Sequence, residues 1–272
     1  FSISRSKERA RGWGIPVPGD PTQIMYVWFD ALNIYQTGIG FFDNEKTYKK
    51  WWPQDVMVIG KGIIRFHAIY WPAILKSAGV LLPKELFIHG YLTVDGQKMS
   101  KTLGNVVDPI KLIEQYGTDT LRYYLLREIP SGADGDFSEV RLKEIYNADL
   151  ANGLGNLVSR VAKLCEINDF EASERKLWFN PGVKKFLEEF KFNDALAGIW
   201  ELIAELNKEI NDKKLWELSR KDAQPILKEA VEIIQLIGYN LQPFLPEISQ
   251  KIQEQFKGPK ITSQKPLFPR LS

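Results

Sequence analysis

The residues with the clearest capacity for chemistry lie in one polar, glycine-bounded segment, Asp95–Asn105. Lys98 and Lys101 lie three residues apart in this segment and flank Ser100. The segment follows an expected strand and precedes an expected helix, so it can form a mobile loop that brings two ammonium groups onto phosphate oxygens. Cations placed in this way stabilise the charge that develops on a leaving pyrophosphate. For the segment taken alone, a solvated hairpin with incidental lysines is the alternative.

Short apolar runs in the same part of the chain predict the strands that would position this loop. Met25–Phe29, Val56–Ile59 and Leu86–Ile88 are bounded by Gly, Pro and polar residues, as buried parallel strands are. Ile63–Leu75 lies between the last two runs and is long enough for a crossover helix. Alternating strands and helices predict an open α/β sheet, which binds ligands at the carboxyl ends of its strands.

From Asp108 onward the apolar periodicity becomes helical. Asp108 is an expected N-cap, Pro109 suits the first helical position, and Gly117 suits a helix end. A second helix is expected over Thr118–Arg127. The rest of the chain contains four amphipathic segments, roughly Glu139–Cys165, Gly182–Leu206, Ala223–Leu241 and Pro246–Phe256. They predict a helical bundle, closed by an extended tail that includes Lys265–Arg270.

The loop Ile129–Ser138 is the expected boundary between these two kinds of structure. Residues 1–140 hold 14 of the 20 Gly, which is typical of strands and tight turns. The predicted fold class is therefore α/β followed by all-α, with domains at residues 1–130 and 131–272.

The composition excludes several classes of protein. With 44% hydrophobic and 12% aromatic residues the chain can build a core, so wholesale disorder is excluded. A formal net charge of +2 argues against a broad phosphate-binding or membrane-binding surface. Cys165 is the one cysteine and cannot form an internal disulfide, and two histidines exclude a multi-histidine metal centre.

Lys98–Thr102 reads Lys-Met-Ser-Lys-Thr and resembles the signature loop of the class I aminoacyl-tRNA synthetases, with Thr102 at the final serine position. The flanking stretches Ile88–Tyr91 and Gly104–Pro109 are similar to the same class. Several stretches resemble the methionyl-tRNA synthetases in particular: Ser2–Arg5, Tyr26–Ala31, Phe66–Ala73, Asn156–Arg160, Trp216 and Leu267–Arg270.

The resemblance implies a division of the chain into two functional parts. Residues 1–130 would form the C-terminal half of a Rossmann-like catalytic domain with its KMSKT loop, and residues 131–272 an α-helical anticodon-binding domain. The family's N-terminal half, with a His-Ile-Gly-His-type nucleotide-binding element and an inserted zinc-type domain, would lie outside this chain. That half is therefore an expected partner, and the chain alone is expected to be inactive. Gly62 stands where the family usually carries aspartate, so one polar contact to the substrate would be absent.

The implied reaction is ATP-dependent activation of methionine to methionyl-adenylate, then transfer to initiator and elongator methionine tRNAs. The methionine carboxylate itself attacks the α-phosphate, so catalysis consists mostly of positioning and charge stabilisation. The implied catalytic residues are Lys98, Ser100 and Lys101, and the implied ATP-binding residues are Lys98, Lys101, His89 and Gly90. Mg²⁺ would arrive with ATP, with no metal site in this chain. The implied location is the cytoplasm, without membrane contact.

The resemblance also assigns a methionine site, lined by Trp28, Ala31, Tyr35, Ile63 and His67, with Arg5 nearby. A thioether is apolar, polarisable and a weak acceptor, so aromatic walls with one or two polar tips suit it. For these residues taken alone, a hydrogen-bonded core histidine and plain core aromatics are the alternatives.

A third set of residues could read unpaired bases. Asn156 and Arg160 lie four residues apart and so share a helix face, and Trp216 is expected to open a different helix. An amide, a guanidinium and an indole can hydrogen-bond and stack with splayed RNA bases. The resemblance assigns all three to the CAU anticodon, while a solvated helix face is the alternative for the Asn/Arg pair alone.

Two other functions stay open from the sequence. One is a related class I synthetase for valine, leucine or isoleucine, although a branched aliphatic pocket would not need His67 or Tyr35. The other is a non-catalytic tRNA-binding module that keeps the helical bundle as a binding platform.

Overall fold

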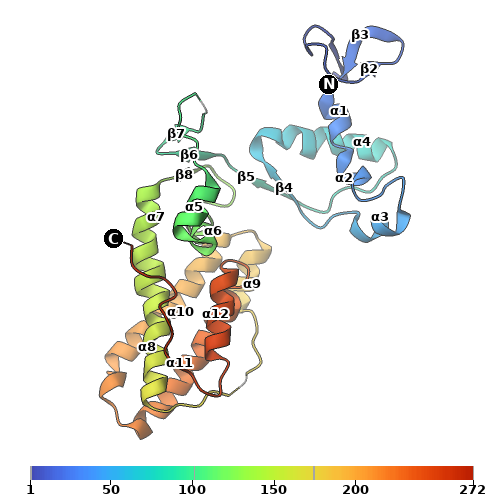
Figure 1. The fold of residues 1–272 in the computed structure, drawn as a ribbon. Helices are drawn as coiled ribbons and strands as arrows, with labels where there is room; N and C mark the ends of the chain where they lie inside the picture. Colours follow the sequence, from blue (N-terminus) through green and yellow to red (C-terminus); the bar gives the residue numbers. More distant parts are fainter. Residues whose placement is uncertain (1, 101, 174, 272) are drawn as a thin grey trace. The chain divides into compact units, whose positions relative to one another are not determined.

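The computed structural model describes residues 2–100, 102–173 and 175–271. It divides into two compact units, Phe1–Gly90 and Tyr91–Ser272, each with its own elements (Figure 1). Within the described residues, no helix is both long and apolar enough to cross a membrane.

The first unit begins with a small antiparallel sheet. Its strands are β1 (Ser4–Ser6), β2 (Pro16–Val17) and β3 (Asp20–Met25), in the order β1-β3-β2. The predicted strand Met25–Phe29 is wrong, because β3 ends at Met25 and the chain continues as helices α1 (Val27–Ala31) and α2 (Ile34–Thr37). A short apolar run does not distinguish a strand from a helix segment, and here Val27, Trp28 and Phe29 lie in the short helix α1.

The second sheet of this unit confirms that two of the predicted strands pair in parallel, but the predicted burial is wrong for Val58, which is 63% exposed. Strands β4 (Met57–Gly60) and β5 (Leu86–His89) pair in parallel, with Gly60 opposite His89. The connection contains the 3₁₀ turn η1 (Lys61–Ile63), the π-helix η2 (Phe66–Tyr70) and α4 (Trp71–Ser77), which confirms a helical crossover. Helix α3 (Glu45–Trp51) precedes β4. The buried core of this unit consists of Leu32, Trp52, Met57, Ile59, Trp71 and Leu75.

The second unit begins with a three-stranded sheet in the order β7-β6-β8. Strands β6 (Leu92–Val94) and β7 (Gln97–Lys98) form a hairpin, and β8 (Gly135–Phe137) pairs with β6 in parallel. The Asp136 carboxylate accepts hydrogen bonds from Thr93 Oγ1 at 2.5 Å and from the Gly96 N–H at 2.8 Å. These two bonds fix the hairpin turn that leads into the lysine loop.

Helices α5 (Pro109–Tyr116) and α6 (Thr118–Glu128) follow the lysine loop. The Asp108 side chain accepts from the Ile110 N–H at 2.9 Å, which confirms the predicted N-cap. Gly117 ends α5 with φ +87°, a left-handed value that glycine adopts without strain.

Over residues 139–173 and 175–271, the bundle contains one long helical segment and four separate α-helices. The long segment runs through α7 (Glu139–Ile145), the π-helix η3 (Tyr146–Gly155) and α8 (Asn156–Ile167). The expected helix over Gly182–Leu206 is in fact two helices, because the chain turns at Phe190 with φ +56°. The remaining helices are α9 (Pro181–Glu188), α10 (Phe192–Asp212), α11 (Arg220–Asn240) and α12 (Pro246–Phe256).

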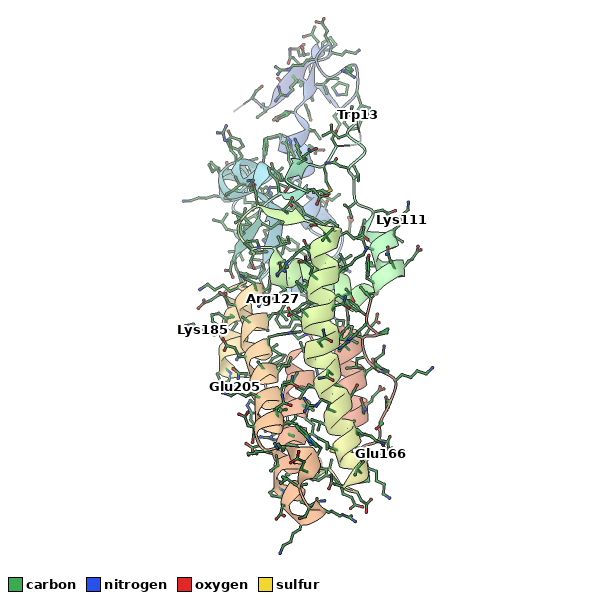
Figure 2. The ribbon with its side chains drawn as sticks, turned by 90° about the vertical axis from the view of Figure 1, so that its left-hand side faces the viewer. Trp13, Lys111, Arg127, Glu166, Lys185 and Glu205 are labelled. Atoms are coloured by element: carbon green, nitrogen blue, oxygen red, sulfur yellow. The ribbon has the colours of Figure 1, made fainter. Side chains whose placement is uncertain are left out.

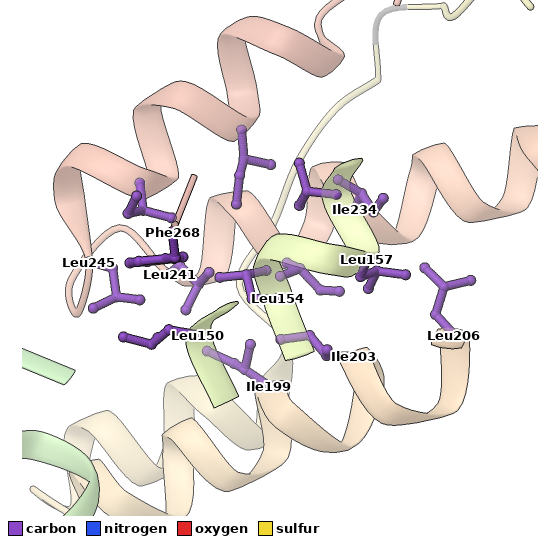
Figure 3. Close-up of a cluster of buried hydrophobic side chains, with 14 of the residues drawn as sticks. Leu150, Leu154, Leu157, Ile199, Ile203, Leu206, Ile234, Leu241, Leu245 and Phe268 are labelled. Carbon is purple, nitrogen blue, oxygen red and sulfur yellow. The ribbon is translucent and has the colours of Figure 1, made fainter. Parts of the chain in front are cut away.

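Apolar side chains from several bundle helices meet in one core. Figure 3 shows Leu154 and Leu157 from the long segment together with Ile199 and Ile203 from α10 and Ile234 from α11. The predicted extended tail is confirmed. Phe268 is buried, Tyr146 Oη donates to the Pro269 carbonyl at 2.8 Å, and the Asn147 amide pairs with the backbone of Leu271.

The division into compact units falls after Gly90, 40 residues before the expected functional boundary. The reason is that α5 and α6 contribute Leu112, Tyr116 and Tyr123 to the same core as the bundle helices. The division at residue 130 between a catalytic and an anticodon-binding part stays a prediction.

Candidate functional site

The first unit contains a buried histidine whose two ring nitrogens both have hydrogen-bond partners. His67 lies in the π-helix η2 with no exposed surface. Its Nδ1 lies 3.0 Å from the Ile63 carbonyl oxygen, and its Nε2 lies 3.1 Å from Tyr35 Oη. Because a carbonyl oxygen can only accept, Nδ1 carries a proton, and in the neutral ring Nε2 accepts from the Tyr35 hydroxyl. The imidazole is therefore held in one tautomer and one orientation.

Aromatic rings surround this histidine. Trp28 lies 6.2 Å from the His67 ring centroid and stacks on Phe66 at 4.5 Å. Tyr35 packs against both His67 and Trp71, at 5.7 and 5.2 Å. Four of the predicted methionine-site residues, namely Trp28, Tyr35, Ile63 and His67, are thus brought together by α1, α2, η1 and η2. Such walls suit an apolar, polarisable side chain.

Sequence reasoning missed two members of this cluster, Phe66 and Trp71. Trp71 is fully buried and its indole lies 6.4 Å from the His67 ring. Ile63, His67 and Trp71 are spaced four residues apart, which is the signal that could have placed them on one helix face. Ala31 is half-buried on α1.

Arg5 lies at the edge of this cluster. Its guanidinium carbon is 4.0 Å from the centroid of the Tyr26 ring, and Tyr26 in turn meets Phe66 edge-on at 6.3 Å. Arg5 lines a cavity of about 810 Å³ together with Trp13, Ile24 and other residues of the N-terminal sheet. Its assignment to methionine stays a prediction.

His89 and Gly90, predicted to contact ATP, lie at the carboxyl end of the parallel pair. A Cβ on Gly60 would lie 3.5 Å from Cε1 of His89, so the ring of His89 sits directly against the glycine backbone of the neighbouring strand. His89 is exposed, and its Nδ1 lies 2.9 Å from the Gly90 carbonyl oxygen. Ligands of open α/β sheets bind at this edge.

The lysine loop belongs to the second unit and is braced by Asn105. The Ser100 N–H donates to Asn105 Oδ1 at 2.8 Å, and Asn105 Nδ2 donates to the Lys98 carbonyl at 3.2 Å. Ser100 Oγ also accepts from the Thr102 N–H at 3.2 Å. One side chain thus holds the backbone on both sides of Met99. The Lys98 side chain is exposed, while Lys101 lies outside the described residues.

The three predicted base-reading residues lie on neighbouring elements of the bundle. The guanidinium carbon of Arg160, on α8, is 5.7 Å from the ring centroid of Trp216. Arg160 also donates to Asn211 Oδ1, on α10, at 2.7 Å. Trp216 is 53% exposed, and Asn156, one turn before Arg160, is also exposed. Arg160 is half-buried, so the Asn156 amide and the Trp216 indole are the more exposed groups of the three.

One detail of this prediction is wrong. Trp216 does not open a helix; it lies in the 3₁₀ turn η4 (Leu215–Glu217), which follows the left-handed residue Lys214 with φ +44°. The buried residue of the turn is Leu215, so the turn directs the neighbouring indole outward. The adjacent Lys213 is paired with Glu209, whose carboxylate raises the pKa of this ammonium.

Comparison with known proteins identifies the family. The sequence model of the tRNA synthetases class I (M) matches residues 1–162. A methionine–tRNA ligase from a Nostoc species is 45% identical, over 94% of this chain and 52% of that protein. One from Thermotoga maritima is 40% identical, over 93% of this chain and 42% of that protein. The chain thus spans about half the length of the curated relatives it matches.

Solved structures agree with this result. Methionyl-tRNA synthetase of Mycobacterium tuberculosis bound by methionyl-adenylate has a TM-score of 0.84 and 35% identity, covering 99% of this chain and 60% of that one. The apo form of that enzyme has a TM-score of 0.82 at 33% identity. These relatives favour the methionine group over the valine, leucine or isoleucine alternative. The chain belongs to the class I tRNA synthetases of the methionine group.

Proposed function

We propose that the protein to which this chain belongs is a methionine–tRNA ligase. The observation that carries this proposal is the fixed His67 imidazole, which is hydrogen-bonded to Tyr35 and packs against the rings of Trp28 and Trp71. A thioether gains dispersion and sulfur–aromatic contacts from such rings, and the Tyr35–His67 pair provides the polar tip. A pocket for a branched aliphatic side chain would not need a polar pair of this kind beside its ligand.

The reaction has two steps. The methionine carboxylate attacks the α-phosphorus of ATP, a new P–O bond forms, and pyrophosphate leaves. The hydroxyl of the terminal tRNA ribose then attacks the carbonyl carbon of methionyl-adenylate, loses its proton, and AMP leaves. Mg²⁺ enters as part of the ATP substrate. Neither step needs a nucleophile from this chain.

The chain's own residues would contribute positioning and charge. Lys98 and Lys101 would neutralise the charge that builds on the departing pyrophosphate, and Ser100 would hold the loop that carries them. The Ser100 N–H and the Lys98 carbonyl of this loop are hydrogen-bonded to Asn105. This part of the loop is therefore ordered before the substrate binds. His89 and Gly90 would contact ATP at the strand ends.

In the helical bundle, the residues that would select the tRNA are Asn156, Arg160 and Trp216. The exposed Asn156 amide and Trp216 indole and the half-buried Arg160 guanidinium suit splayed bases of an anticodon loop. The partners are therefore methionine, ATP and methionine tRNA, together with the remaining part of the enzyme.

The test is amino-acid-dependent exchange of labelled pyrophosphate by the complete protein. Methionine is expected to support exchange and isoleucine and valine are not, while the 272-residue chain alone is expected to support none. Lys101→Ala is expected to reduce the rate by about 10²–10³-fold and to leave methionine binding nearly unchanged, because the lost interaction is made mainly in the transition state. A complete protein that binds tRNA but makes no adenylate would be a non-catalytic binding module, and the proposal would be wrong.

A further inference from the structure

Two of the predicted base-reading residues directly follow a π-helix. Asn156 begins α8 immediately after η3, and Arg160 lies one turn later. Figure 2 shows α7, η3 and α8 as one continuous helical rod that ends near the labelled Glu166. π-helices are rare, usually a single turn long, and frequent at functional sites. Here η3 is ten residues long, so the direction in which Asn156 and Arg160 point depends on how η3 winds.

A change in the winding of η3 would rotate the residues that follow it. Each residue of an α-helix advances by about 100° around the axis, because one turn takes about 3.6 residues. If η3 tightened by one residue, the face that carries Asn156 and Arg160 would turn by that angle relative to α7. Trp216 lies on η4 and would not turn with them, so Arg160 would lose its contact with the indole at 5.7 Å.

The C-terminal tail, residues 267–271, holds the start of η3. Tyr146 Oη donates to the Pro269 carbonyl at 2.8 Å. The Asn147 amide bonds both backbone groups of Leu271, because Nδ2 donates to the carbonyl at 3.2 Å and Oδ1 accepts from the N–H at 3.0 Å. The tail is thus hydrogen-bonded to the first two residues of the π-helix.

A tail residue also contacts the end of η3. The Phe268 ring is buried, and it meets the Tyr146 ring edge-on at 5.8 Å. Figure 3 shows Phe268 in the same cluster as Leu150 and Leu154, which both belong to η3. At Gly155, the last residue of η3, a Cβ would lie 3.0 Å from the Leu150 carbonyl oxygen and 3.6 Å from Cδ2 of Phe268. A side chain there would press on the carbonyl five residues earlier, so glycine permits this winding.

We propose that the tail is a positioning element for tRNA recognition: it keeps η3 in its π register and so sets the face on which Asn156 and Arg160 lie. The inference rests on the proposed function, because it names the part of the chain that aligns the predicted base-reading residues. The tail acts through η3 and does not itself touch the RNA. Loss of its contacts with η3 therefore lowers the affinity for RNA, and not only the stability of the bundle.

The experiment measures binding of a labelled RNA hairpin with a CAU loop to the 272-residue chain by fluorescence anisotropy, well below the melting temperature of each variant. The double variant Tyr146→Phe/Asn147→Ala removes the hydrogen bonds to the tail and is expected to weaken binding by about fivefold. Gly155→Ala is expected to weaken it by a similar factor, although alanine favours helices more than glycine does. Unchanged affinity in both variants would overturn the proposal.

Two matched controls change similar groups elsewhere in the same unit. Gly198 lies in α10, and a Cβ there would meet nothing within 4 Å, so Gly198→Ala is the control for Gly155→Ala. Ser263, just before the tail, donates to the Glu166 carboxylate near the end of α8 at 2.8 Å, so Ser263→Ala removes a hydrogen bond away from η3. Both variants are expected to bind as the unchanged chain does. A fivefold loss in both controls would contradict the proposal.

A double-mutant cycle distinguishes positioning from a loss of stability. In the background Asn156→Ala/Arg160→Ala the tail has no base-reading face left to align, and Trp216 supplies the remaining binding. Tyr146→Phe/Asn147→Ala is expected to weaken this remaining binding by less than about twofold, the usual error of additivity. The same fivefold loss in both backgrounds would show that the tail acts on the bundle as a whole, and the proposal would be wrong.

A hairpin with a changed loop separates this inference from the proposed function. If the unchanged chain prefers the CAU loop and the η3 variants keep that preference and affinity, only the inference fails. If the unchanged chain does not distinguish the two loops, the bundle does not read the anticodon, and the inference fails together with that part of the proposed function. Methionine-dependent pyrophosphate exchange by the complete protein tests the catalytic part independently.

Discussion

The two compact units hold their candidate chemistry in opposite ways. In the first unit the His67 imidazole is fully buried, with both ring nitrogens bonded and aromatic rings on several sides. In the second unit two of the predicted base-reading residues, Asn156 and Trp216, are exposed, and Arg160 is half-buried; none of the three belongs to the core of the bundle. A buried site must be shaped by the same contacts that stabilise its unit, whereas a surface site can change without affecting the core.

The units also differ in how much core they have. Among the residues that the structure describes, the core cluster of the first unit has six buried hydrophobic residues, while that of the second unit is larger and extends from Leu112 to Phe268. Buried apolar area is the main stabilising contribution to a fold, so the second unit is expected to be much the more stable of the two. The predictions below test this difference, from the largest expected effect to the smallest.

The largest effect is expected from the bundle core. Leu154 has no exposed surface, so Leu154→Ala should lower the free energy of unfolding of the second unit by about 3–5 kcal/mol through lost burial and a cavity. Urea unfolding followed by far-UV circular dichroism would measure it. Tryptophan fluorescence reports mostly the first unit, which holds Trp13, Trp28, Trp51, Trp52 and Trp71. If the urea midpoint measured by tryptophan fluorescence falls by the same amount as the midpoint measured by circular dichroism, the two units unfold as one.

A smaller effect is expected at Asp119, which is buried on α6 and accepts from the Ile248 N–H, at the start of α12, at 2.7 Å. Asp119→Ala leaves this buried donor without a partner and should cost about 1–3 kcal/mol. Asp119→Asn keeps an acceptor oxygen and is the matched control. Urea midpoints of the three proteins at neutral pH would measure the difference, and equal losses in both variants would mean that the hydrogen bond is not responsible.

The same residue predicts a pH dependence. Burial raises the pKa of the Asp119 carboxyl above its ordinary value of 3.8, so the folded state binds this proton more tightly than the unfolded state. The stability of the unchanged chain relative to Asp119→Asn should therefore fall as the pH rises from 3.8 through the folded pKa, and then stay constant. Urea midpoints across that window would check it; a relative stability that rises with pH would show that the folded pKa is lowered instead.

At the surface site, Trp216→Ala should weaken binding of a CAU hairpin by about 1–3 kcal/mol, the value of one stacked base. Because the indole is 53% exposed, the melting temperature should change little. Trp178→Ala is a suitable control, since Trp178 is 45% exposed in the same unit and has its own arginine, Arg175, at 4.7 Å. A large fall in melting temperature with Trp216→Ala would identify Trp216 as a structural residue.

The smallest effect is expected at the buried site. Tyr35→Phe keeps the ring but removes the hydroxyl that bonds His67, and should weaken methionine binding by the complete protein by about 0.5–1.5 kcal/mol. Calorimetry with methionine would measure it. An unchanged affinity would mean that the Tyr35–His67 bond does not shape the pocket.

Local signals in the sequence determined much of this molecule. The Asp108 cap, the Gly117 helix end, the strand around Val58 and the extended tail each depend on residue types within a few positions of one another, and all are confirmed. The lysine signature and the aromatic stretches around Trp28 and His67 were also sufficient for the family, because their order and spacing are specific in combination.

Tertiary structure decided what depends on partners distant in the sequence. The apolar run Met25–Phe29 is too short to distinguish a strand from a helix by its sequence, and the structure forms a helix from Val27 onward. Trp71 packs against Tyr35, which lies on another helix, and Asn211 bonds Arg160 across 51 residues. Helices α5 and α6 join the bundle because their apolar faces are buried there, which no periodicity within them could indicate. Sequence specifies which groups are present and which faces are apolar, and packing between distant elements selects which of those groups meet.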